Sequence, residues 1–328
     1  MKKIISLLFA GLVAFSTFAA PTVMDVVAKQ RYPWGLVDIT CKVEGIDELI
    51  TDPKFVLSAV FPNSVDIVKM TKFWVMRDGV KSSNLAADAN GNYRLLWDAK
   101  ADLGEVRYTN MVVRVDIKGH QKVQLWESGP YWAMTNIGAE KPEDYGYYFW
   151  WGDTVGYKYE NYMWIASNGS NSNFSFSDGN TRTDNKNVAT LKNEGWITAD
   201  GALAPEHDAA HKYWGGDWRM PTKQEIEDLN SKCDWTWTTM NGVNGYVVRG
   251  KGDYASNTIF LPCVGTADMT NILHLGLEGG YWSSEPNPNY FGGGCASWYI
   301  FFKSSGAEVS YRNRWNGQSI RPVQSSTK

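Results

Sequence analysis

Cysteine and histidine are scarce in this chain of 328 residues, which has four of each. No two cysteines have C-x-x-C spacing and no cysteine lies close to a histidine, so we predict no metal site. Lysine and arginine (32) nearly balance aspartate and glutamate (35), and no basic stripe runs between aromatic residues, which argues against a nucleic-acid partner. After the first twenty residues, no stretch has the roughly 18 consecutive apolar residues of a membrane-spanning helix.

The N-terminus has the parts of a secretory signal peptide. A basic start, Met1 to Lys3, precedes an apolar run from Ile4 to Phe18. We predict a signal peptide over residues 1–19 with cleavage after Ala19, which keeps Pro21 away from the first mature position. No cysteine follows this site, so no lipid anchor is indicated. The expected location is outside the cell, in the periplasm or at the cell envelope.

Four cysteines allow three complete pairings, and sequence cannot choose among them. They are Cys41, Cys233, Cys263 and Cys295. If the two halves of the chain are separate domains, one disulfide among the last three is the natural expectation. We predict that Cys263 pairs with Cys295.

Aromatic residues are abundant, and their balance is unusual, because 16 Trp and 17 Tyr exceed 13 Phe. Trp and Tyr carry a polar edge that needs a partner or water. This bias fits a protein of sheets and loops with half-buried rings, or a surface that stacks on ligands.

Residues 22–121 have the pattern of a β-sandwich. The segment from Leu36 to Val43 alternates with period two, as a half-buried strand does. Further strands are predicted at 55–61, 73–76, 93–97 and 111–117, with turn residues between them. Several short strands over about 100 residues predict an immunoglobulin- or fibronectin-like domain. Without a cluster of site-forming residues, this domain is interpreted as a spacer or docking module.

Residues 122–325 predict a mixed domain with two short helices. Thr222 and Glu225 have the spacing of a capping box, so a helix is expected to begin there. A second helix is predicted from Pro205, near its first position, to Trp214, with Gly215 ending it.

Within that second helix, His207 and His211 would share one face, as metal ligands can. The H-E-x-x-H order is absent, and ordinary helix residues are the favoured interpretation.

The rest of this domain predicts hairpins and one long loop. Asn241-Gly242 is a hairpin turn between 235–238 and 246–249. Residues 161–192 are rich in Asn, Ser and Gly and are predicted to form a surface loop.

An ordered series of motifs in this domain resembles a known family. The series is Gly-Pro-Tyr-Trp-Ala-Met-Thr-Asn, Tyr-Gly-Tyr-Tyr-Phe-Trp-Trp-Gly, Asp-Ala-Ala-His, Trp-Arg-Met-Pro-Thr, Phe-Leu-Pro, Gly-Tyr-Trp-Ser-Ser and Gly-Gln-Ser-Ile-Arg-Pro-Val. It resembles the Fibrobacter succinogenes major paralogous domain over most of residues 122–325. The resemblance implies an α+β, C-type-lectin-like fold with twisted antiparallel sheets. It also implies a relation to formylglycine-generating enzymes, whose Arg-Leu-Pro-Thr-Glu segment is similar to Arg219–Ile226.

The candidate ligand-binding residues combine aromatic rings with a lectin-like tripeptide. Glu285-Pro286-Asn287 is similar to the calcium and sugar motif of mannose-type C-type lectins, which leaves calcium open as a cofactor. No other cofactor is predicted. Flat rings with neighbouring amide and carboxylate oxygens could bind a sugar or a peptide. The candidates are Trp150, Trp151, Trp282, Glu285, Asn287, Trp315 and Asn316, with Tyr147 and Tyr148 as further rings.

Three functions remain open at this point. The favoured hypothesis is an exported, non-enzymatic binding or adhesion module for a glycan or a protein. The first alternative is an oxidase of the formylglycine-generating type that uses Cys263 and Cys295. The second is a purely structural surface protein.

Overall fold

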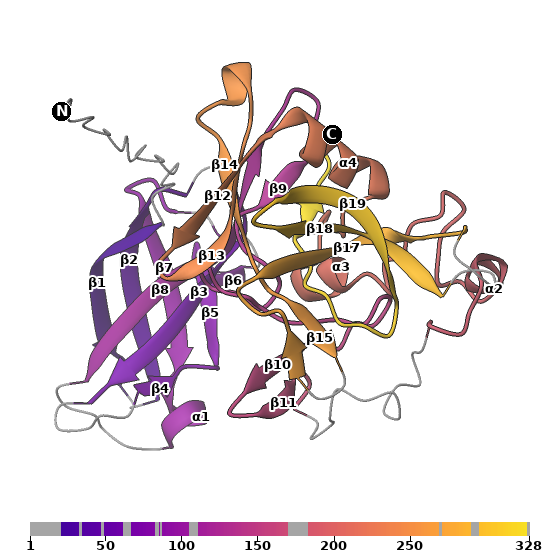
Figure 1. Cartoon of the computed structure of the whole chain (residues 1–328). Helices are drawn as coiled ribbons and strands as arrows, with labels where there is room; N and C mark the ends of the chain where they lie inside the picture. The colour runs from indigo at the N-terminus through magenta and orange to yellow at the C-terminus, as the bar shows by residue number, and fades with distance from the viewer. Residues whose placement is uncertain are drawn as a thin grey trace, which may run out of the picture. The chain divides into compact units, whose positions relative to one another are not determined.

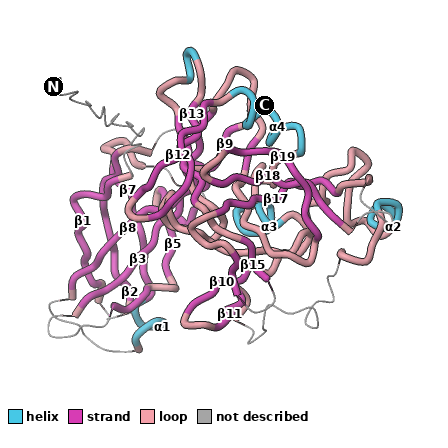
Figure 2. The backbone as a smooth tube through the Cα atoms, in the orientation of Figure 1, coloured by secondary structure: helices cyan, strands magenta, loops and turns pink. Residues whose placement is uncertain are grey.

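The computed structural model describes residues 21–32, 35–46, 49–61, 67–82, 85, 87–104, 111–169, 183–268, 271–289 and 295–326. The predicted signal peptide, residues 1–19, lies outside these ranges. The chain divides into two compact units between Lys122 and Val123. Strands and loops dominate both units, and the helices are short (Figure 2). No helix in the described ranges combines the length and apolar character needed to cross a membrane.

The N-terminal unit contains two antiparallel sheets (Figure 1). The first has the order β1-β2-β7-β5-β6, with β1 (Thr22–Gln30), β2 (Leu36–Glu44), β7 (Asn92–Asp98), β5 (Phe73–Arg77) and β6 (Val80–Ser82). In the second, β3 (Ile50–Val60) pairs with β4 (Ile67–Lys69) and with β8 (Val112–Gln124). A short helix, α1 (Ala99–Leu103), follows β7.

Both sheets contribute side chains to one apolar core. Val37, Ile39 and Cys41 of β2 alternate inward and are at most 2% exposed. Leu57 of β3 and Ile117 of β8 belong to the same cluster. The alternation in the sequence therefore predicted the buried face of these strands, because successive side chains of a strand point to opposite sides.

The C-terminal unit combines small antiparallel sheets with short helices. Two sheets have three strands each: β12 (Asp234–Met240), β13 (Val243–Arg249) and β14 (Thr258–Pro262), and β17 (Glu278–Pro286), β18 (Ala296–Lys303) and β19 (Gly306–Asn313). The two-stranded sheets are β10 (Tyr157–Glu160) with β11 (Met163–Ala166), and β15 (Thr266–Asp268) with β16 (Asn271–Leu273). In addition, β9 (Tyr131–Ala133) pairs with β20 (Val323–Gln324). The helices are α2 (Val188–Asn193), α3 (Ala209–Trp214) and α4 (Lys223–Lys232), and a 3-10 turn covers Gly252–Tyr254.

The mostly antiparallel β architecture with short helices agrees with the predicted α+β class at the level of secondary structure. The capping box of α4 is confirmed: the Glu225 N–H donates to Thr222 Oγ1 (3.2 Å) and the Thr222 N–H donates to Glu225 Oε2 (2.8 Å). The predicted hairpin is also confirmed, with Asn241 and Gly242 both at positive φ between β12 and β13.

Three predictions are wrong: the start of the second helix, the position of His207 within it, and the loop at 161–192. The helix expected from Pro205 begins only at Ala209, because the Asp208 side chain caps it by accepting from the N–H groups of Ala210 and His211. His207 thus lies outside the helix and stacks on Trp196, with the ring centroids 3.9 Å apart.

The predicted loop at 161–192 contains strand β11 and the start of α2, so more than two helices occur in this unit. Helix α2 was missed because it buries only Leu191, which leaves no helical period in the sequence.

Candidate functional site

The tryptophans proposed as ligand platforms lie in the core of the C-terminal unit. Trp150, Trp151 and Trp282 are 6%, 1% and 0% exposed. The indole N–H of Trp151 donates to the Ser283 carbonyl (2.8 Å), and that of Trp282 donates to the Phe149 carbonyl (3.0 Å). Packing places these rings where a ligand from solvent has no face to stack on.

The lectin-like tripeptide has structural partners within the fold. The Glu285 carboxylate accepts from the backbone N–H of Lys223 in the first turn of α4, and burial raises its pKa. Asn287 is 3% exposed, and its Oδ1 accepts from the Asn289 N–H at 2.9 Å, which forms a local turn. Both side chains therefore stabilise the strand end of β17 and the helix start beside it.

Trp315 and Asn316 lie in the turn after β19 and are half-buried. The Asn316 N–H donates to the Asn313 carbonyl (3.1 Å). Neither residue lines the pocket described below, and nor does any other of the seven ligand-binding candidates.

The predicted disulfide is wrong, because all four cysteines are free. Cys263 is fully buried directly after β14, where its neighbours include Tyr145 and Tyr246, whereas Cys295 is partly exposed near Arg314. Burial, reinforced by Glu278, raises the pKa of Cys263 to about 12. The two thiols thus have different surroundings, which cysteine count and spacing cannot reveal.

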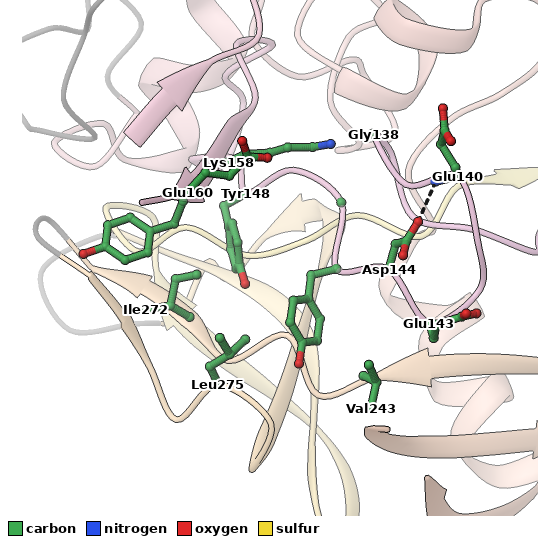
Figure 3. Close-up of a pocket in the computed structure, with 13 residues that line it drawn as sticks. Gly138, Glu140, Glu143, Asp144, Tyr148, Lys158, Glu160, Val243, Ile272 and Leu275 are labelled. Carbon is green, nitrogen blue, oxygen red and sulfur yellow. Dashed lines mark hydrogen bonds between the residues drawn. The ribbon is translucent and has the colours of Figure 1, made fainter. Parts of the chain in front are cut away.

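The C-terminal unit does contain a pocket, of about 580 Å³ (Figure 3). Its walls come from the loop before β10, from β10 itself, from the start of β13 and from the β15–β16 hairpin. In Figure 3, Glu140, Glu143 and Asp144 gather on one side of the cluster, away from Glu160 and Ile272. The lining residues are Gly138, Glu140, Glu143, Asp144, Tyr145, Gly146, Tyr148, Lys158, Tyr159, Glu160, Val243, Ile272 and Leu275.

A buried arginine stabilises the loop that carries the acidic side chains, through hydrogen bonds that Asn136 relays. Arg321 is 1% exposed, and its Nε donates to Asn136 Oδ1 (2.9 Å). Asn136 Nδ2 in turn donates to the Tyr145 carbonyl (3.0 Å). Asp144 closes the loop by accepting from the N–H groups of Glu140 and Lys141.

Two glycines in this loop have positive φ and close neighbours. A Cβ on Gly138 would lie 2.1 Å from the Tyr147 ring, and a Cβ on Gly146 would lie 2.4 Å from the Ile137 carbonyl oxygen. Only glycine meets both demands, so the wall of the pocket depends on these two positions.

The electrostatics of the pocket are dominated by carboxylates. Among the residues that the structure describes, the lining includes four of them and a single ammonium group, that of Lys158, which leaves a formal excess of three negative charges. Glu143 is only 9% exposed, and its Oε1 accepts from Asn241 Nδ2 at 2.8 Å. Burial, with a smaller effect of Cys263, raises the pKa of Tyr145, so its hydroxyl stays neutral.

The pocket was not predicted from the sequence, although Tyr148 was among the rings considered. A signal was present: Glu140, Glu143 and Asp144 form an acidic run directly before the aromatic segment that begins at Tyr145. A search for exposed tryptophans does not detect this signal, because the cluster combines carboxylates with tyrosines. The contributions of β10 and the β15–β16 hairpin are distant in sequence and needed the fold.

Among the described residues, no group of three or more His, Cys, Asp or Glu side chains is arranged to hold a metal ion. The lining offers hydrogen-bond acceptors, neutral hydroxyls, aromatic faces and aliphatic contacts, which suits non-covalent binding. Comparison with known proteins gives no match to a family model, a curated protein or a solved structure.

Proposed function

We propose that this chain is an exported, non-catalytic binding module and that the acidic, tyrosine-lined pocket of its C-terminal unit is the ligand site. The single observation that carries the proposal is the pocket itself, which combines four carboxylates with the rings of Tyr145, Tyr148 and Tyr159. Pockets with a few polar groups among apolar and aromatic walls are the usual place for ligands. The N-terminal unit, as an immunoglobulin-like spacer, would hold a lectin-like C-terminal unit at the envelope or outside the cell.

The oxidase alternative receives no support from its cysteines. A reactive thiol needs surroundings that favour the thiolate. The pKa of Cys263 is instead raised to about 12, and the side chain is fully buried. The test below also addresses the second alternative, a purely structural surface protein.

The test uses the mature chain, residues 20–328, on glycan and peptide arrays with and without a calcium chelator. Leu275 lines the pocket and is 43% exposed, so Leu275→Trp should fill the cavity and abolish binding of any ligand that enters it. Leu277→Trp is the matched control, because Leu277 is 63% exposed and does not line the pocket. It should retain full binding.

Two outcomes would contradict the proposal. A ligand whose binding survives Leu275→Trp would place the site elsewhere on the protein. A chain that binds nothing on either array would favour the purely structural role. Loss of binding with the chelator would point to calcium, which the sequence left open.

A further inference from the structure

We infer that the pocket binds the side chain of a lysine or arginine from a protein partner. This inference rests on the proposed function and specifies the ligand of the same site. Its first basis is charge complementarity, because the lining has an excess of three negative charges within one cavity. A cationic side chain that enters would approach Glu160 on one side and the acidic loop on the other (Figure 3).

The aromatic rings of the lining are suited to a cation. Lys158 lines the pocket, and its Nζ lies 4.9 Å from the centre of the Tyr147 ring. This geometry is that of a cation–π contact, but Tyr147 does not itself line the pocket, so the contact lies beside the cavity and not within it. The rings of Tyr145 and Tyr159, which line the pocket, offer further faces of the same kind.

The surroundings of the pocket favour a peptide over a sugar. Met163 pairs with Glu160 and Ile165 pairs with Lys158 across the β10–β11 hairpin, so each lies on the same face as a pocket residue. Met163 and Ile165 are 63% and 46% exposed. Leu275, inside the pocket, is 43% exposed.

Met163 and Ile165 are thus exposed apolar residues on the hairpin that contributes β10 to the pocket, and Leu275 is one in the lining itself. Sugars stack on flat aromatic rings, whereas exposed aliphatic side chains pack against apolar ones, and methionine is enriched in protein interfaces. The tip of the hairpin adds Tyr162, which is 92% exposed and held at φ 63°. With Asn161 at φ 51°, it forms the two-residue turn of the hairpin, in which positive φ is the ordinary geometry. The occupant that fits all of these features is a basic residue flanked by apolar ones.

The experiment measures binding of the mature chain to an array of peptides in matched pairs. Each pair carries the same apolar-flanked sequence with either arginine or citrulline, which has nearly the same shape and no charge. We expect arginine peptides to bind about tenfold tighter than their citrulline partners and to weaken as salt rises. Glu160→Gln should weaken binding of the arginine peptides about threefold to tenfold. Glu308→Gln, an exposed carboxylate on β19, is the control and should leave binding unchanged.

The Lys158→Met variant should change the affinity for arginine peptides in the opposite direction to Glu160→Gln. It removes the one positive charge of the lining but keeps most of the aliphatic stem, so arginine peptides should bind several-fold more tightly. A neutral ligand would gain nothing from this change. Equal binding of arginine and citrulline peptides, or weaker binding by the Lys158→Met variant, would overturn the inference.

Failure of this inference can be separated from failure of the proposed function. If amino sugars or neutral glycans bind, and Leu275→Trp abolishes that binding while arginine peptides do not bind, the pocket is a ligand site and the peptide inference is wrong. If no ligand depends on Leu275, both are wrong.

Discussion

The two units of this chain are stabilised in different ways. The core of the N-terminal unit is built from apolar residues that alternate along strands of two sheets, such as Ile39, Leu57 and Val115. The core of the C-terminal unit also contains buried arginines, asparagines and serines. Arg321 illustrates this: it donates to the carbonyls of Ala133, Met134 and Phe260 as well as to Asn136.

This difference shows how segments without regular secondary structure can be kept ordered inside a protein. Loops bring backbone carbonyls into the interior, and an unsatisfied buried carbonyl costs about 1–3 kcal/mol. A buried guanidinium has five N–H donors and can satisfy several carbonyls at once. Burial lowers the pKa of Arg321 to about 10, so it remains charged at neutral pH. The acidic loop of the pocket therefore depends on side-chain hydrogen bonds, whereas the N-terminal strands depend on apolar burial.

Arg321→Met should have the largest effect on the C-terminal unit. Methionine fills similar space, but three buried carbonyls and Asn136 Oδ1 lose their donor. We expect a loss of at least about 3 kcal/mol in the free energy of unfolding, and hydrogen exchange should accelerate in 133–147. Hydrogen exchange measured by mass spectrometry reports each unit separately.

The counterpart in the N-terminal unit is Leu57→Ala, which should cost about 2–5 kcal/mol by creating a cavity among apolar neighbours. Its exchange should accelerate in the sheets around Leu57 and leave 133–147 unchanged. Uniform acceleration throughout the chain after Arg321→Met would contradict a local role for the arginine.

A smaller effect is expected at the capping box of α4. Thr222→Ala removes the hydroxyl that accepts from the Glu225 N–H, so the free energy of unfolding should fall by about 1 kcal/mol. Thr236→Ala, at an exposed position of β12, is the matched control and should change it by less than about 0.5 kcal/mol. Denaturant titration of both variants measures the difference. If the two variants lost equal free energy of unfolding, the hydrogen bond between the Glu225 N–H and Thr222 would contribute no stability of its own.

The same contrast explains how far the sequence could be interpreted. Alternation in 36–43 and the spacing of Thr222 and Glu225 are local patterns, and both predicted their elements correctly. The pocket depends on contacts between segments far apart, such as Asn136 with Arg321, and no local pattern encodes them. The burial of the tryptophans that were expected at a ligand surface could not be predicted for a related reason. Hydropathy cannot tell whether the polar edge of Trp151 finds water or, as it does, the Ser283 carbonyl.

The smallest effect we predict concerns the pH dependence of stability. His207 stacks on Trp196, and burial, opposed by the nearby Glu206, lowers the pKa of its imidazole below 6.5. The unfolded chain therefore takes up a proton at higher pH than the folded chain does. The stability that neutral His207 contributes is present above pH 6.5 and is lost as the pH falls through the lower pKa of the folded state.

His207→Phe keeps an aromatic ring against Trp196 but cannot take up a proton. Between pH 8 and pH 5, its melting temperature should therefore fall less than that of the unmodified protein, since one source of acid destabilisation has gone. Thermal unfolding of both proteins across this range measures the difference. Parallel curves would mean that His207 titrates alike in the folded and unfolded chains, and the stacked ring would then be an apolar contact, of the same kind as those in the N-terminal core.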